Sequence, residues 1–293
     1  MGKHVKGSLL TYSRGGFSPT SFVAKQYRIS SGLLQAVGQG VARTYEPCTE
    51  KALPTALARV SSGDISPLAF ASHFGELGYF QLARRTLAPS FPAWLPNSQA
   101  WTAVNAAFQH YQCVLLGASQ NLPEGDPLEW ILAQSRTVAL CLSFIGVLGP
   151  GDEVEMRDEV ERIQAHKPYA RRDQLFELPA REWRKSLRSG AAPSAIIRRE
   201  LCQIITDNIA GMHREFVIEP GAIEAESFFL CTTVEAIYWQ LADQIETNMV
   251  RRCLDCRKFF IARDKRQQYC PLLPGSTGGR CSPKLNGRNA RQD

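Results

Sequence analysis

Four cysteines near one end of the 293-residue chain carry its clearest chemical signal. Cys253, Cys256, Cys270 and Cys281 follow the pattern C-x2-C-x13-C-x10-C. Two thiolates separated by two residues can bind one metal ion from a single tight turn, and a second pair completes a tetrahedron, the geometry of structural zinc sites. The spacing therefore predicts one Zn²⁺ ion bound by these four cysteines.

Four thiolates would fill the coordination sphere of this ion. No position then remains for water or substrate, so we expect the zinc to hold structure rather than to perform chemistry. Iron–sulfur clusters also use four thiolates, but they suit a basic, hydrophilic segment less well. So short a segment has too small a core to fold alone, and zinc contributes about 10–16 kcal/mol of apparent free energy to such units.

Basic residues gather in the same segment. From Val250 onward the chain has eleven Lys and Arg residues against three Asp and Glu residues, a net charge of +8. Residues 1–249 are slightly acidic, with a net charge of −2. A basic zinc unit most often binds nucleic acid, and we expect DNA rather than RNA. The alternative is a protein-interaction or assembly module that docks on an acidic protein surface.

The candidate nucleic-acid contacts come from this basic set, because each phosphate that a cation neutralises releases counterions and adds sequence-independent affinity. They are Arg251, Arg252, Lys258, Arg263, Lys265, Arg266, Lys284, Arg288 and Arg291. The last three share one face if that segment is helical. Charge alone does not separate this function from a basic tail that meets only solvent. The neighbouring aromatics Phe259, Phe260 and Tyr269 are expected to pack in the small core rather than to stack on bases.

The run from RRCLDCRKFF through RQQYC to Cys281 resembles the zinc finger of bacterial CGNR-type proteins. In that family a helical N-terminal region precedes a four-cysteine finger, and its members are described as stress-linked transcription regulators. The resemblance implies the same arrangement here. In the family the last cysteine begins Cys-Gly-Asn-Arg, whereas here Ser282-Pro283-Lys284 follows Cys281 and Asn-Gly-Arg comes at 286–288. These departures affect the ligand contacts more than the finger fold.

The expected fold is mainly α, with a helical body over residues 1–249 and a small zinc ribbon-like finger over residues 250–293. Ser66-Pro67 is an N-cap followed by proline, and it opens a helix through the run LAFASHFGELGYFQLARR. Apolar residues at three- and four-residue steps predict another helix from Trp101 to Leu115. Asp126-Pro127 repeats the cap signal and opens a helix that should end near Gly149.

Helices are also predicted for the second half of the body. A charged helix is expected from Asp152 to about His166, followed by an irregular connector with partial order over residues 168–193. Apolar spacing predicts helices over residues 197–216 and 228–245. Alternation over residues 23–29 suggests a short strand near the start of the chain.

Enzyme motifs are absent from the sequence. It has no Gly-x-Ser-x-Gly, no phosphate-binding Gly-Lys-Ser/Thr loop, no His-Glu-x-x-His and only five histidines. A hydrolase or nuclease in the body therefore remains only a third possibility, and the body is expected to sense a ligand, form a homodimer or contact other proteins. The remaining cysteines are expected to be buried, unreactive apolar side chains; they are Cys48, Cys113, Cys141, Cys202 and Cys231.

The apolar segments of the sequence predict no membrane partner. The N-terminal run lacks a sustained apolar core, and the longest apolar stretch, residues 138–148, is too short to span a bilayer. We therefore expect a cytoplasmic protein, and in a reducing compartment a cysteine cluster favours a metal over disulfides.

Overall fold

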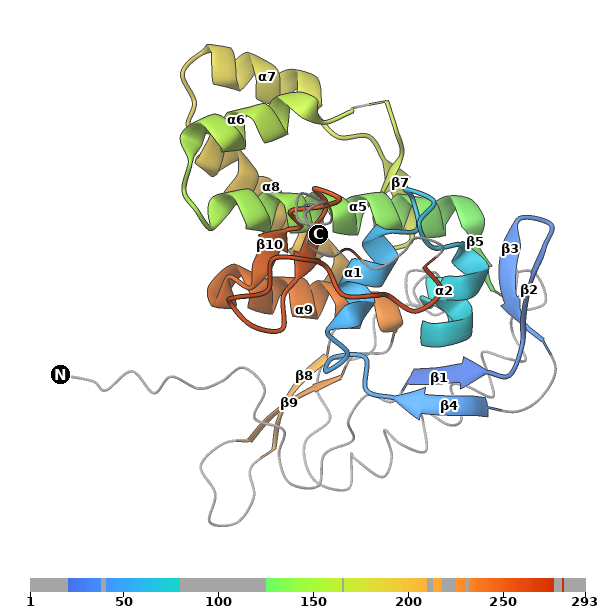
Figure 1. Ribbon diagram of the computed structural model, residues 1–293. Helices are drawn as coiled ribbons and strands as arrows, with labels where there is room; N and C mark the ends of the chain where they lie inside the picture. Colours follow the sequence, from blue (N-terminus) through green and yellow to red (C-terminus); the bar gives the residue numbers. More distant parts are fainter. Residues whose placement is uncertain are drawn as a thin grey trace, which may run out of the picture.

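Helices and short strands alternate along the chain in the computed structural model (Figure 1). The structure describes residues 21–37, 41–79, 125–164, 166–209, 213–217, 225–229, 232–276 and 281. Over these residues it has seven helices and five small antiparallel sheets. The predicted helical content is present, but the content of strands makes the fold mixed rather than mainly α.

The helix α5 (Leu128–Leu148) lies at the centre of the molecule (Figure 1). It packs against α1 (Ala52–Ala58), α6 (Glu153–Arg162), α8 (Pro193–Ile209) and α9 (Thr233–Thr247). Within the part of the chain described, it alone is long and apolar enough to cross a membrane, and 72% of its most apolar window is buried in the fold. A helix that is apolar on most faces and covered on them is typical of a protein core.

The start of α5 differs from the prediction, because Asp126 does not cap it. The N-cap is Pro127, and Asp126 is fully buried, accepting hydrogen bonds from the backbone N–H groups of Leu77, Gly78 and Tyr79. Burial, with the charge of Glu76 nearby, raises the pKa of Asp126 to about 7 despite these three bonds. Asp126 therefore binds backbone N–H groups 47 to 49 residues earlier in the chain instead of those of the first turn of α5.

The helix α2 (Pro67–Phe74) confirms the other predicted cap. The Ser66 side chain accepts a hydrogen bond from the Ala69 backbone N–H at 3.0 Å. The helix ends much earlier than predicted, at Gly75, whose φ of +81° is incompatible with a continuing right-handed helix. The helix predicted over residues 101–115 lies outside the described residues.

Residues 23–29 are largely extended as predicted, but they belong to two strands with different partners rather than to one, and further strands follow. These strands are β1 (Ser21–Ala24), β2 (Tyr27–Ser30), β3 (Leu33–Ala36) and β4 (Val41–Tyr45). Ser31 and Gly32 join β2 to β3 with φ values of 51° and 76°, as a two-residue type I′ turn requires. β3 also pairs with β5 (Asp126–Pro127), which ties this hairpin to the start of α5.

The connector predicted over residues 168–193 is regular, which corrects that expectation. It forms the hairpin β6 (Tyr169–Arg171) and β7 (Gln174–Phe176), then α7 (Ala180–Arg188). α6 begins as predicted, with the Asp152 side chain accepting hydrogen bonds from Val154 and Glu155 N–H groups, and ends at Arg162. Short amphipathic pieces of this kind lack the sustained period that identifies a long helix.

In each of the last two helices predicted for the body, part of the predicted range is a strand instead. α8 ends at Ile209, and β8 (His213–Val217) pairs with β9 (Ala225–Phe229) where the prediction had helix. α9 starts at Thr233 and ends at Asn248, a left-handed C-cap with φ of 48°. The chain turns there directly into the cysteine segment.

Candidate metal centre

The first pair of cysteines lies in the turn of a small hairpin. β10 (Val250–Arg252) pairs antiparallel with β11 (Phe259–Ile261), and Cys253 and Cys256 lie between them. The Cys253 N–H donates to the Lys258 carbonyl at 2.9 Å, and the Arg257 N–H donates to the Cys253 carbonyl at 3.0 Å. Arg257 has a φ of 61°, and this left-handed residue reverses the chain just after the second cysteine.

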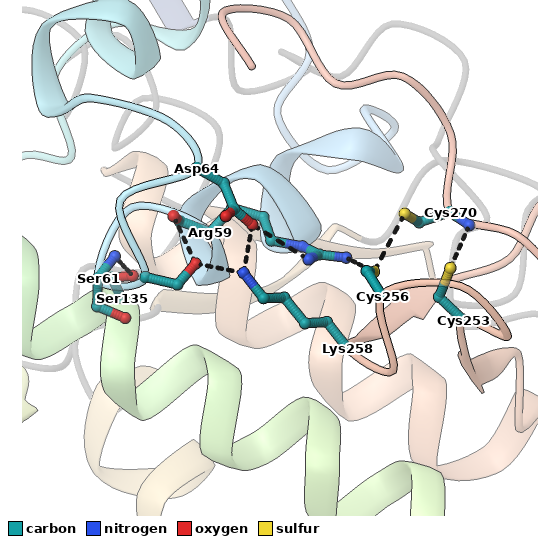
Figure 2. A network of polar contacts seen from close by, with 9 residues as sticks. Arg59, Ser61, Asp64, Ser135, Cys253, Cys256, Lys258 and Cys270 are labelled. Carbon is teal, nitrogen blue, oxygen red and sulfur yellow. Dashed lines mark hydrogen bonds and ion pairs between the residues drawn. The ribbon is translucent and has the colours of Figure 1, made fainter. Parts of the chain in front are cut away.

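The four cysteine sulfurs form one cluster. Their Sγ atoms all lie within 4.8 Å of one another, and those of Cys256 and Cys270 are 3.8 Å apart (Figure 2). Four thiolates placed about 2.3 Å from one tetrahedral ion have sulfurs about 3.8 Å apart, whereas a disulfide needs about 2.05 Å. The donor set and its spacing therefore fit a metal ion, and Cys253, Cys256, Cys270 and Cys281 could hold one.

Backbone donors favour the thiolate form of Cys253. Burial disfavours that charge, but N–H groups of Cys270, Cys256 and Asp255 outweigh burial and lower the pKa of Cys253 to about 7. The Cys270 N–H lies 3.5 Å from the Cys253 sulfur. Burial raises the pKa of Cys281 to about 11, with Cys256 adding to the rise and Cys270 opposing it. Burial also raises the pKa of Cys270, and the neighbouring thiols add to that rise. Four thiolates repel one another in so small a volume, and a bound cation removes that repulsion.

Arg59 lies beside the cysteine cluster, although no sequence pattern pointed to it. It follows α1, is only 5% exposed, and donates from Nη2 to the Cys256 sulfur at 3.5 Å (Figure 2). Its Nη1 donates to Asp64 Oδ2 at 3.2 Å. Burial disfavours the Arg59 cation, but Cys256, Cys270 and Asp64 outweigh it and raise its pKa. Nothing local marks this residue, because 197 positions separate it from Cys256.

The hairpin is bound to the body by polar contacts as well. Lys258 Nζ lies 2.5 Å from Asp64 Oδ2 and 2.9 Å from the Ser62 hydroxyl. The Ile261 N–H donates to the Thr55 hydroxyl at 3.1 Å. Arg252 forms an ion pair with Glu155 of α6 at 2.7 Å. Two of the candidate nucleic-acid residues, Arg252 and Lys258, are therefore already paired with carboxylates of the same chain.

Apolar contacts continue from the hairpin into the body. Val250 and Ile261 belong to the main core, and Phe259 packs against it beside Gly146 of α5. Phe260 is fully buried in a second, small core with Cys253, Ala262 and Cys270, against which Tyr269 packs. The expected packing role of the aromatics is confirmed for Phe260 and Tyr269, whereas Phe259 faces the body.

The remaining candidate nucleic-acid residues lie in two groups. Arg263, Lys265 and Arg266 are exposed on the loop that follows β11, between the second and third cysteines. Arg251 is half-buried, and its Nη1 donates to the carbonyls of Asn248 and Val250. The other three lie outside the described residues: Lys284, Arg288 and Arg291.

The scattered cysteines differ among themselves. Cys48 and Cys141 are buried as predicted, and burial raises the pKa of Cys141 far above that of a free thiol. Cys202 is exposed on α8, so its predicted burial is wrong. Cys113 and Cys231 lie outside the described residues.

The four-cysteine cluster, its arginine neighbour and its basic loop thus form one assembled site on the central helix. Comparison of the chain with models of protein families, with curated proteins and with solved structures finds no match.

Proposed function

We propose that the protein binds one Zn²⁺ ion through Cys253, Cys256, Cys270 and Cys281, and that the resulting ribbon-like finger presents a basic loop to nucleic acid in a transcription regulator. The observation that carries this proposal is the four-sulfur cluster with exposed cations in the chain between its second and third ligands. Zinc is preferred because a tetrahedral set of four thiolates suits it, and the surrounding loop is hydrophilic. The metal would be structural, since the four thiolates occupy all four tetrahedral positions and leave none for water.

The basic loop supplies the nucleic-acid part of the proposal. Arg257, Arg263 and Lys265 are exposed and make no ion pair with a described residue. Arg266 lies 3.7 Å from Asp264, and both side chains are more than half exposed, so water screens this pair. These cations are therefore available to phosphates. Arg252 and Lys258 would contribute less, because each would first have to leave its carboxylate.

Salt-dependent binding of duplex DNA tests the proposal. The zinc-loaded chain should bind a mixed-sequence duplex with a log affinity that falls by about 0.9 per phosphate contact per log unit of salt. Replacing Arg263, Lys265 and Arg266 together with Gln should weaken binding to all sequences and flatten that slope. A matched control replaces three exposed cations of α7 with Gln, namely Arg181, Lys185 and Arg188. Equal losses in the two triple variants would remove the loop as the binding element.

A second candidate function is docking on an acidic protein surface. The ion pairs of Arg252 with Glu155 and of Lys258 with Asp64 favour it, because the finger already pairs with carboxylates of its own body. Titration with poly-L-glutamate and with DNA of equal charge separates the two candidates. Tighter binding of the polypeptide would favour protein docking, and tighter binding of DNA would favour the regulator.

A further inference from the structure

A cavity lies where the cysteine hairpin meets the helical body. Its volume is about 670 Å³, within the range of about 300–1,000 Å³ common for small-molecule sites. Its walls come from the end of α1, the middle of α5, the end of α6 and the start of β6. Lys258 and Phe259 close it from the hairpin side. An occupant would therefore touch the body and the hairpin at once.

The lining of this cavity is strongly basic. A single carboxylate, Glu159, faces five cations: Arg59, Arg136, Arg162, Lys167 and Lys258. Three of these cations have carboxylate partners, since Arg59 and Lys258 share Asp64, and Arg162 pairs with Glu159. Arg136 and Lys167 form no ion pair with any residue that the structure describes. Neither cation is therefore held by a carboxylate in direct contact among the described residues, and Arg136 has only Glu129 as a more distant electrostatic neighbour.

Arg136 is the better placed of the two. It projects from the central helix α5, and its Nε donates to the Pro168 carbonyl at 2.6 Å, which fixes the guanidinium plane. It is half-buried, whereas Lys167 is exposed at the rim. Half-burial weakens the hydration of the Arg136 cation, so an anion gains more there than at a fully solvated arginine.

The rest of the wall is apolar with a few hydroxyls. Carbon-rich surface comes from Ala58, Ala139, Leu140, Leu142 and Phe259. Ser61 and Tyr169 add hydroxyl groups. Such a wall suits an apolar group, and the cations suit an anionic head attached to it.

We propose that this cavity binds a small organic anion, a phosphate ester or carboxylate that carries an apolar group, with Arg136 as its main anion contact and Lys167 as a second. The site does not use the exposed cations of the basic loop, Arg263, Lys265 and Arg266, and shares only Lys258 with the candidate nucleic-acid contacts. Because Lys258 and Phe259 line it, an occupied cavity ties the hairpin more firmly to α5 and α6.

Calorimetric titration of the zinc-loaded full chain tests this site. The probes are phenyl phosphate, benzoate, inorganic phosphate and phenol. We expect one molecule of phenyl phosphate or of benzoate to bind per chain. The probe that binds more tightly shows whether the site prefers a phosphate or a carboxylate group. Inorganic phosphate should bind more weakly, since it lacks the apolar group, and phenol should not bind. Equal binding of phenol, or no binding of either aromatic anion, would overturn the proposal.

Substitutions locate the binding in the cavity. Arg136→Gln should weaken phenyl phosphate by about tenfold or more, and Arg136→Lys should recover part of the loss. Because Arg136 also holds Pro168, the exposed Lys167→Gln gives a second readout that does not threaten the fold, with an expected loss of several-fold. Arg188→Gln, on exposed α7, is the control and should bind as the native chain does. Unchanged affinity in both Arg136→Gln and Lys167→Gln would place the anion elsewhere.

Discussion

At the scale of single residues, the metal centre depends on a cation that is not a ligand. Arg59 lies 3.5 Å from the Cys256 sulfur and is held by Asp64, so it would offset part of the negative charge of four thiolates if they bind the proposed divalent ion. Neighbours that hydrogen-bond a metal ligand typically change metal affinity by about 10–100-fold. The same side chain joins α1 to the hairpin.

Arg59→Met therefore tests this contribution. The variant keeps a buried side chain of similar length and leaves Asp64 paired with Lys258. We expect zinc affinity to fall by about tenfold, measured by competition with a chromophoric chelator. Arg188→Met, which removes an exposed cation from α7, is the control. Native affinity in Arg59→Met would mean that the arginine serves only to attach the hairpin.

Asp126 carries a second prediction at this scale. Burial raises its pKa to about 7 from an ordinary value of 3.8, so between these two pH values the folded state holds a proton that the unfolded state releases. The contribution of Asp126 to stability is then greatest below pH 3.8, falls as the pH rises toward 7, and is constant above.

The measurement compares the native chain with Asp126→Asn by denaturant unfolding across this pH range. Asparagine cannot ionise, so the difference in unfolding free energy between the two proteins should change with pH and level off above about 7. If the cysteine cluster holds the proposed zinc, its release at acid pH would affect both proteins and cancel in the difference. A difference that is flat across the whole range would show that Asp126 does not titrate there.

At the scale of elements, the ring of Phe259 in the hairpin packs against α5 beside Gly146. A methyl group on Gly146 would lie 2.4 Å from the Phe259 ring, well inside contact distance. Gly146 lies in the last turn of α5, and the Phe259 ring occupies the space that a side chain there would need.

Gly146→Ala should have two opposing effects on the free energy of unfolding. Alanine in a helix gains about 1 kcal/mol over glycine, whereas overpacking costs about 1–3 kcal/mol. We expect the clash to win, with a net loss of about 1–2 kcal/mol in thermal or denaturant unfolding. When Phe259 is already replaced with Ala, adding Gly146→Ala should cause no such loss of stability. A single variant that unfolds at or above the native temperature would show that the ring moves aside freely.

Features that depend only on neighbouring residues could be predicted from the sequence. The C-x2-C spacing is local, and it predicted a cluster that the fold brings within 4.8 Å. Ser66-Pro67 is equally local and caps α2 as predicted. Asp126-Pro127 has the same form, yet Asp126 turns to the backbone of residues 77–79. A tertiary partner can outcompete a local cap, and no single-chain pattern reveals it.

Short strands were the other source of error. Residues 213–217 and 225–229 pair with each other, although their apolar residues continue the spacing of the neighbouring helices. A five-residue run fits either period, so only pairing decides it. The residues beside the metal ligands were missed for a related reason: Arg59 and Asp64 come from another part of the chain, and sequence distance hides their contact.

At the scale of the whole molecule, the cysteine hairpin shares its core with the body. Cys253→Ser should abolish zinc binding, and the segment from Val250 onward should lose its order. The body should keep its helices, because α5, α8 and α9 pack on one another, but unfold at a lower temperature without Val250 and Ile261.

Elemental analysis, circular dichroism and limited proteolysis measure these three outcomes. Cys202→Ser is the matched control, since this exposed thiol of α8 lies outside the cluster and should leave the metal in place. A metal-free Cys253→Ser chain whose hairpin resists protease as well as the native one would contradict the structural role of the ion.

The bond between Ile261 and Thr55 has a consequence for how the chain is made. These residues are 206 positions apart, so α1 leaves the ribosome long before the strand that completes its surroundings. α5 also packs on α1 and is made much earlier, so only the side of α1 that meets β11 stays uncovered. At synthesis rates of about 5–20 residues per second, that side is uncovered for roughly 10–40 s. Folding of the α1 face is therefore a late event, and it coincides with the emergence of the cysteines. During that time the side of α1 that meets β11 is a surface that chaperones can recognise.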